Sequence, residues 1–260
     1  MTSQSGRIQN EIAFHTSVAA KEMNDLTATP DTLVERYREC RQWRTRRLEC
    51  VIRFLTQHQP KRICDFGCGS GEMACRLGRI GFSVTGLDVS PELIEVARQR
   101  ARLDGVEDRV NFVVADGGAR DLSVGKFDAV LAMSVLHHLP LEDGLATLES
   151  LLLPGGRVAI HEPVAYSKGL QWLRDRTPVR KDISPDERQL SAAEILRIQE
   201  RFEVEDIRHF HLFARLSRVF PPTLWSWIAP GVFGLDSVLL GLPWFRKLAG
   251  IVVIQAKKRE

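Results

Sequence analysis

The 260-residue chain is 44% hydrophobic, enough to enclose one sizeable core, so we expect a single domain over residues 1–260. The formal net charge is only +3, and this mild basic excess gives no strong reason to expect a nucleic-acid partner. The five cysteines include no C-x-x-C pair and suit neither a disulfide framework nor a metal site.

Residues 1–58 have helix-like patterns and are expected to form a helical extension that caps the core. The pattern breaks at Thr27–Asp31, where Thr29 or Asp31 is expected to cap the next helix. The polar N-terminus lacks the apolar segment of a signal peptide, and no uninterrupted apolar stretch reaches the roughly 18 residues of a membrane span. We therefore expect a soluble, cytoplasmic protein without a transmembrane segment.

Residues 61–162 alternate short apolar runs with amphipathic stretches. The predicted strands are Arg62–Phe66, Phe82–Leu87, Val110–Val114, Phe127–Met133 and Arg157–Ile160. The predicted helices between them are Glu72–Ile80, Pro91–Leu103 and Leu141–Leu152. This alternation predicts a doubly wound α/β fold, in which a parallel sheet is covered by helices on both faces.

Residues 163–260 are less regular and are expected to contain substrate-side insertions and the last strands. A helix is predicted at Ala192–Arg201 and strands at Phe202–Phe213 and Ile251–Ala256. The insert Val219–Leu248 between these strands is apolar and aromatic but interrupted by four prolines. We expect it to pack on its own domain; the alternatives are a lid over a hydrophobic substrate, a dimer contact or peripheral contact with a membrane.

The most informative segment is Asp65-Phe66-Gly67-Cys68-Gly69-Ser70-Gly71, between the first predicted strand and its helix. Glycines let the backbone turn tightly and approach a ligand, and the start of the helix offers free N–H groups. The segment therefore predicts a cradle for a nucleotide-type ligand, although any tight strand-to-helix turn can also use glycine.

Acidic residues end the second and third predicted strands. Asp88 can accept both hydroxyl protons of a ribose, or it can cap the helix that begins at Pro91, a role open also to Ser90. Asp116 precedes Gly117 and can accept from an adenine amine, or it can form an ordinary Asp-Gly turn. Taken together with the glycine-rich segment, the two carboxylates favour an adenosine-containing ligand.

Five segments in order resemble the class I S-adenosylmethionine-dependent methyltransferases: Asp65–Gly71, Gly86–Ser90, Ala115–Gly117, Phe127–Leu139 and Leu153–Arg157. The resemblance implies a Rossmann-like seven-stranded sheet with an antiparallel last strand, S-adenosyl-L-methionine as cofactor and S-adenosyl-L-homocysteine as product. It also implies that three glycines face the methionine part of the cofactor, that Asp88 holds the ribose and that Asp116 meets the adenine. The predicted cofactor site comprises Asp65, Gly67, Cys68, Gly69, Gly71, Asp88, Val89, Asp116, Gly117, Met133 and His138.

Methyl transfer from a sulfonium is a direct displacement, which for a hydroxyl acceptor also requires a base. The candidate bases are His137, just after the fourth predicted strand, and His161 with Glu162 at the end of the fifth. His137 is preferred because the resemblance implies a functional residue in this loop, although a His-His pair there can also line the cofactor pocket. His15 could close over the sulfonium or be a half-exposed helix histidine.

The acceptor is expected to be a small molecule, methylated on oxygen. Basic runs at Arg36–Arg47 and Arg174–Lys181 either meet an anionic group of the substrate or form solvated helix faces. Ala132–Val135 stands where related enzymes that methylate exocyclic amines have an Asn-Pro-Pro-Tyr motif, which argues against nucleic-acid and glutamine acceptors. A homodimer stays an alternative, with the insert Val219–Leu248 as a candidate contact.

Two other functions remain open from the sequence. A nicotinamide-dependent oxidoreductase shares the glycine-rich segment and Asp88, but Glu72 occupies the place of its third glycine. Such an enzyme also gives no reason for Leu153-Pro154-Gly155-Gly156 before the fifth strand. A catalytically silent scaffold that binds the cofactor would keep the same motifs.

Overall fold

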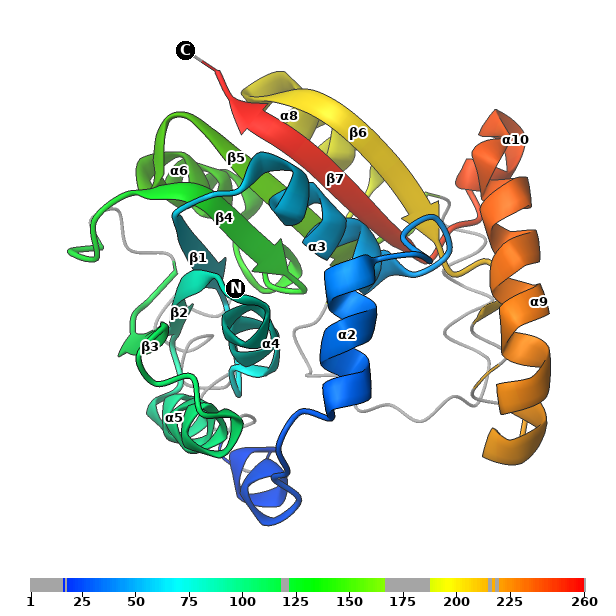
Figure 1. Ribbon diagram of the computed structural model, residues 1–260. Coiled ribbons are helices and arrows are strands. Elements are labelled where there is room, and N and C mark those ends of the chain that lie inside the picture. The colour runs from blue at the N-terminus through cyan, green and yellow to red at the C-terminus, as the bar shows by residue number, and fades with distance from the viewer. Residues whose placement is uncertain are drawn as a thin grey trace.

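The computed structural model describes residues 16, 18–117, 122–166, 188–214, 217 and 220–259. Its sheet has seven strands in the order β3-β2-β1-β4-β5-β7-β6. The strands are β1 (Arg62–Phe66), β2 (Ser83–Asp88), β3 (Val110–Val114), β4 (Phe127–Met133), β5 (Leu152–Pro163), β6 (Phe202–Phe210) and β7 (Ile251–Lys258). Strands β1 to β5 are parallel, and β7 is antiparallel to both of its neighbours, β5 and β6 (Figure 1). This confirms the predicted fold class.

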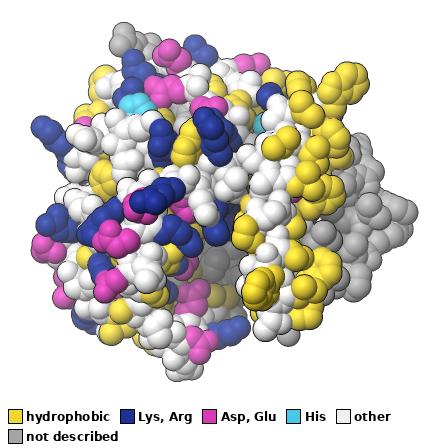
Figure 2. Space-filling view, turned by 45° about the vertical axis from the view of Figure 1, so that its right-hand side comes forward, with side chains coloured by type: hydrophobic (Ala, Val, Ile, Leu, Met, Phe, Trp, Pro, Cys, Tyr) yellow, Lys and Arg dark blue, Asp and Glu magenta, His cyan; other side chains and the backbone are white. Residues whose placement is uncertain are grey.

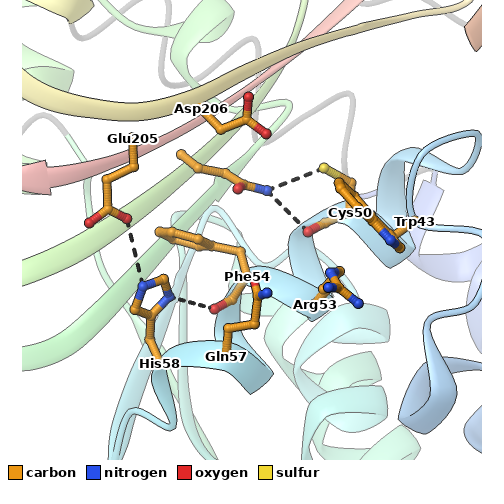
Figure 3. A pocket seen from close by; sticks show the side chains of 9 residues that line it. Trp43, Cys50, Arg53, Phe54, Gln57, His58, Glu205 and Asp206 are labelled. Carbon is orange, nitrogen blue, oxygen red and sulfur yellow. Dashed lines mark hydrogen bonds and ion pairs between the residues drawn. The ribbon is translucent and has the colours of Figure 1, made fainter.

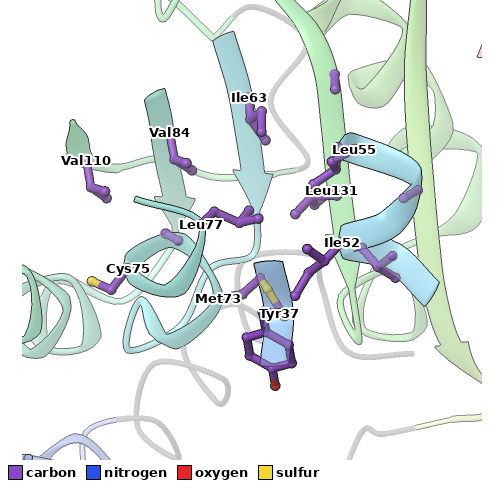
Figure 4. Close-up of a cluster of buried hydrophobic side chains, with 14 of the residues drawn as sticks. Tyr37, Ile52, Leu55, Ile63, Met73, Cys75, Leu77, Val84, Val110 and Leu131 are labelled. Atoms are coloured by element: carbon purple, nitrogen blue, oxygen red, sulfur yellow. The ribbon is translucent and has the colours of Figure 1, made fainter. Parts of the chain in front are cut away.

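Helices cover both faces of the sheet. They are α2 (Asp31–Glu39), α3 (Arg47–His58), α4 (Glu72–Ile80), α5 (Pro91–Asp104), α6 (Leu141–Leu151) and α8 (Ala192–Arg201), followed by α9 (Pro222–Gly241) and α10 (Pro243–Arg246). On one face, α3, α4 and α5 bury a cluster that includes Ile52, Ile63, Leu77 and Leu131 (Figure 4). On the other face, α6 and α8 bury a second cluster. The sheet is therefore doubly wound, as the alternation of elements predicted.

The predicted bounds differ most from the structure in β5 and β6. β5 begins at Leu152 rather than Arg157, because the chain pairs with β4 before a register shift opposite Phe127 and Ala129. β6 ends at Phe210 rather than Phe213, because the next backbone amides donate to a side chain of α9 instead of to β7.

The predicted side-chain cap of α2, at Thr29 or Asp31, was also wrong. The residue that precedes α2 is Pro30, and no side chain caps it. The amide and hydroxyl of Thr29 instead donate to the buried Asp104 carboxylate at 2.6 and 2.7 Å. Asp31 forms an ion pair with Arg79. Thr29 therefore ties the N-terminal helices to α5.

Most of the apolar insert forms one long helix, α9, which is followed by the short helix α10. α9 runs for 20 residues, begins at Pro222 and contains Pro230 in its interior. Proline suits the first turn of a helix, since the N–H that it lacks has no partner there. α9 is long and apolar enough to cross a membrane by length and composition alone, although polar residues, including Asp236, interrupt its apolar run.

Candidate functional site

The glycine-rich loop lies at the carboxyl end of β1, between β1 and α4. The amides of Gly67 and Cys68 both donate to the Leu87 carbonyl at the end of β2, at 2.8 and 2.9 Å. The Gly71 amide donates to the Cys68 carbonyl at 3.0 Å, and Gly71 starts α4 with a φ of 74°. The loop is thus fixed to β2 and turns directly into the helix.

Two of the glycines meet different surroundings. A Cβ at Gly67 would come within 2.5 Å of Val135, so close packing alone requires a glycine there. A Cβ at Gly69 would meet nothing within 4 Å, although its φ of +52° also favours glycine. The backbone of Gly69 therefore borders open space at the crest of the loop.

Asp88 connects the loop to the end of β2. One carboxylate oxygen accepts from the Gly69 amide at 2.8 Å and the other from the Ser90 amide at 3.0 Å. The cap of α5 is Ser90, whose hydroxyl accepts from the Leu93 amide at 3.2 Å. Asp88 is therefore not needed as a helix cap, and its oxygens retain acceptor capacity for further donors.

Asp65 is a buried carboxylate beneath the loop. The residue is 2% exposed, and its Oδ2 atom has no hydrogen-bond partner among the described residues. Burial, with a smaller contribution from the charge of Asp88, raises the pKa of Asp65 to about 7, and a hydrogen bond from the Ala74 backbone opposes this. An unpaired acceptor in a buried position is costly, so this oxygen calls for a donor that the described residues do not supply.

Arg47, at the start of α3, is partly exposed as a residue but has one buried nitrogen atom. Its Nε atom is buried and has no hydrogen-bond partner in the part of the chain that the structure describes. Burial lowers the pKa of the guanidinium, while the nearby Tyr37 and Glu72 raise it. Glu72 and Ala74 both lie in the first turn of α4, so Arg47 and Asp65 both interact with residues of that turn.

The sequence had placed Arg47 only at the end of a basic run. Its neighbours in that run differ from it. Arg36 and Arg46 pair with the buried Glu49, and Arg38 and Arg41 pair with acids on the surface. The position of Arg47 on the buried side of α3 was the only available signal, and it is weak in a segment this rich in arginine.

The remaining predicted cofactor residues border the same edge of the sheet. Asp116 and Gly117 follow β3 and are partly exposed, and a Cβ at Gly117 would come within 2.7 Å of the Phe66 ring. Val89 follows Asp88 and is also partly exposed, while Met133 ends β4 and packs on the cluster beneath α3 and α4. The structure therefore brings the predicted groups to the carboxyl ends of β1, β2, β3 and β4, where ligands bind in open α/β sheets.

Three predicted residues form a second group at the ends of β4 and β5. His137 Nδ1 lies 2.6 Å from Glu162 Oε2, and both side chains are buried. Glu162 Oε1 accepts from the amides of Val135 and Leu136 at 2.9 and 2.8 Å. His138 stacks on His137 with 4.0 Å between ring centroids. Glu162 thus orients the His137 ring, because both of its oxygens are committed to the same loop.

His161 lies on the opposite face of β5 from Glu162. Both of its ring nitrogens are buried without a partner among the described residues. Burial, followed by the charge of Arg47, lowers the pKa of His161 to about 3, so the ring is neutral at physiological pH. A group with so low a pKa is a weak base, which leaves His137 as the better oriented of the two histidines.

His15 and the basic run Arg174–Lys181 lie outside the described residues, and their roles stay predictions.

A separate groove lies between α3 and the strands β6 and β7 (Figure 3). Its walls include Trp43, Phe54, His58 and Glu205, and the Gln255 amide donates to the Cys50 carbonyl at 3.1 Å. Arg53 and Arg208 lie over the Trp43 ring at 4.6 and 4.3 Å. None of the residues lining this groove comes from the glycine-rich loop or the ends of β1, β2 and β4.

Comparison with known proteins decides the family. Residues 64–160 match the family model described as a methyltransferase domain. The fold is similar to that of magnesium protoporphyrin IX methyltransferase from Synechocystis PCC 6803, with a TM-score of 0.55 and 19% identity over 84% of this chain and 85% of that one. The chain is also similar to the ubiquinone biosynthesis O-methyltransferase of Aeromonas salmonicida, with 33% identity over 62% of this chain and 70% of the relative. The chain belongs to the class I S-adenosylmethionine-dependent methyltransferases.

Other members of this methyltransferase family match a shorter stretch. The methyltransferase GfsG of Streptomyces halstedii is 39% identical over 105 residues, which make up 40% of this chain and 38% of GfsG. The chain therefore covers less than two thirds of that relative. The family model covers residues 64–160, which include the glycine-rich segment, and the expected family resemblance is confirmed.

Proposed function

We propose that this protein is an O-methyltransferase that moves a methyl group from S-adenosyl-L-methionine to a hydroxyl of a small organic molecule. The observation that carries the proposal is the buried pair of His137 and Glu162 at the edge of the sheet that also holds the glycine-rich loop. The name of the Aeromonas relative, which specifies an O-methyltransferase, supports oxygen as the acceptor atom.

The residues beneath the glycine-rich loop fit the amino-acid part of the cofactor. That part carries an ammonium and a carboxylate, whereas the site offers an unpaired oxygen of Asp65 and an unpaired Nε of Arg47. Each orphaned group is opposite in charge to one end of such a zwitterion, so binding would satisfy both. Asp88, with acceptor capacity left on both oxygens, would hold the ribose hydroxyls, and Asp116 would meet the adenine.

When bound, the cofactor supplies an electrophilic methyl group next to a sulfonium. The chain must then orient the acceptor and take its proton. A hydrogen bond from His137 Nδ1 to Glu162 places the proton on that nitrogen and leaves Nε2 as the basic atom. Nε2 would take the proton of the acceptor hydroxyl as the methyl group leaves the sulfonium sulfur for that oxygen, and Glu162 would stabilise the resulting imidazolium.

Transfer of an isotopically labelled methyl group tests the proposal. The acceptors are a catechol carboxylate and the matching aminobenzoate, with cofactor binding followed in parallel by titration with S-adenosyl-L-homocysteine. We expect label on the hydroxyl oxygen and not on the amine. Label on nitrogen alone would contradict the assignment of oxygen. Tight binding of the product with no transfer to either acceptor would favour the catalytically silent alternative.

A further inference from the structure

The surface of α9 is the largest feature that the proposed function does not use. The helix has a buried stripe and an exposed stripe on opposite sides. Ala229, Phe233, Asp236 and Leu240 recur at helical spacing on the side that faces the domain. Leu224, Trp227, Gly231, Leu235, Val238 and Leu242 recur with the same spacing on the other side, and all of them are exposed.

The exposed stripe is apolar along its whole length. Its side chains are exposed by 47% at Leu224, 86% at Trp227 and 69% at Val238. The only ionisable residue of the helix is Asp236, and it lies on the buried side at 4% exposure. Figure 2 shows the hydrophobic side chains gathered along α9, while the neighbouring surface mixes charges of both signs. A continuous apolar stripe of this kind marks an interaction surface.

The helix is fastened to the domain along its inner side. The Asp236 carboxylate accepts from the amides of Leu212, Phe213 and Ala214 at 2.8 to 3.1 Å. The Ser237 hydroxyl donates to the Arg44 carbonyl at 3.2 Å. These contacts hold the middle of α9 against the domain, so the helix can lie on a membrane but cannot cross it in this state.

The surroundings of the stripe favour an anionic lipid surface over a second copy of the chain. Arg44, Arg246 and Lys247 are exposed at or beside α9 and α10, and the exposed Trp227 and Trp244 lie near the two ends of the insert. Tryptophan and basic side chains suit the boundary between headgroups and acyl chains. In a symmetric dimer the same patch would face itself and bring like charges together.

We propose that α9 and α10 form an interfacial helix that docks the protein on membranes containing anionic lipids. The helix follows β6, which ends at the same edge of the sheet as the glycine-rich loop and the His137–Glu162 pair. Docking therefore holds the catalytic edge next to the lipid surface. This inference stands independently of the acceptor atom, because it rests on the surface alone.

Flotation of the full chain with vesicles tests the proposal. The probes are vesicles of pure phosphatidylcholine and of phosphatidylcholine with phosphatidylglycerol. We expect the protein to float with the anionic vesicles and less with the neutral ones. L235E/V238E should lower binding by about tenfold or more, since it places charge on the apolar stripe. R246E/K247E should lower binding to anionic vesicles by about fivefold per residue.

Leu196→Glu is the matched control, because Leu196 is an equally apolar side chain, 57% exposed on α8. Binding of S-adenosyl-L-homocysteine shows that each variant is folded. Equal loss in the Leu196→Glu control, or no binding of the unmodified protein to either kind of vesicle, would overturn the proposal. A dimer in sedimentation experiments that L235E/V238E converts to monomer would also overturn it, in favour of a second copy.

Discussion

Two buried carboxylates at the same edge of the sheet are treated in opposite ways. Glu162, at the end of β5, has both oxygens hydrogen-bonded, to His137 and to the amides of Val135 and Leu136. Asp65, at the end of β1, is equally buried but keeps one oxygen without a partner among the described residues. Because buried carboxylate oxygens are normally hydrogen-bonded, the unpaired oxygen of Asp65, which lies beneath the glycine-rich loop, is suited to receive a donor from a ligand.

This difference separates two parts of the site. The region of β4 and β5 is organised in advance, since Glu162 fixes the His137 ring before any ligand arrives. Near the start of α4, Asp65 has an unpaired carboxylate oxygen and the Arg47 guanidinium has an unpaired Nε among the described residues, and a zwitterionic ligand can pair with both. The first region is suited to catalysis and the second to binding, and variants can separate the two roles.

The largest expected effect is on turnover. His137→Ala should lower kcat by about a thousandfold, because it removes the group that takes the acceptor proton. The affinity for S-adenosyl-L-homocysteine should change little, since the glycine-rich loop and Asp65 are intact. Steady-state kinetics and calorimetric titration of the same preparation measure both quantities. Unchanged kcat would remove His137 as the base.

A smaller loss should follow when the orienting partner is changed. Glu162→Gln removes the negative charge that holds His137, and we expect kcat to fall by about a hundredfold. Glu49→Gln is the matched control, since Glu49 is also completely buried and paired, with Arg36 and Arg46. Both variants should unfold at lower temperature, but only the first should slow turnover. Equal kcat values in both would contradict an orienting role for Glu162.

The opposite pattern is expected at Asp65. Asp65→Asn should weaken binding of S-adenosyl-L-homocysteine by about tenfold to a hundredfold, because a buried charge pair with the ligand ammonium is lost. The free protein should become more stable, by on the order of 2 kcal/mol, since an unpaired buried carboxyl is removed. Asp104→Asn is the control: this buried carboxylate is paired with Thr29, so its loss should lower stability and leave binding unchanged. Thermal unfolding and titration calorimetry report the two effects.

The pH dependence of binding gives the smallest expected effect. The pKa of Asp65 in the free protein is raised to about 7, and a bound ammonium should lower it. Only the ionised carboxyl then binds tightly, so the affinity for the product should rise by about tenfold between roughly pH 6 and pH 8. The rise should be absent in Asp65→Asn. A flat profile for the unmodified protein would show that Asp65 does not contact the ligand charge.

The sequence predicted the cofactor half of the fold well, for a physical reason. Buried parallel strands require short apolar runs, and the turns between them require glycine and acidic residues, so local patterns from Arg62 to Met133 are unambiguous. The insert α9 was harder, because proline signals a break in sequence while Pro222 starts the helix and Pro230 is accommodated within it. The end of β6 depends on Asp236, which acts across 22 or more residues and leaves no local signal.

In the candidate site, too, residues within a local motif were predicted, whereas relations that depend on packing were missed. Asp65, Asp88 and the glycines were predicted because the motif itself forms the loop. The pairing of His137 with Glu162 was not, since the two residues were considered as separate bases and only the adjacency of β4 and β5 joins them. Arg47 was missed as a site residue because its burial depends on how α3 packs against α4.

The central claim is that the unpaired groups beneath the glycine-rich loop form the subsite for the amino-acid end of the cofactor. Calorimetric titration of the unmodified protein and of Asp65→Asn with S-adenosyl-L-homocysteine, and with NAD in parallel, tests it most directly. We expect S-adenosyl-L-homocysteine to bind the unmodified protein and to bind the variant more weakly. NAD should bind neither protein. Equal affinity of the two proteins for the product, or binding of NAD alone, would contradict the claim.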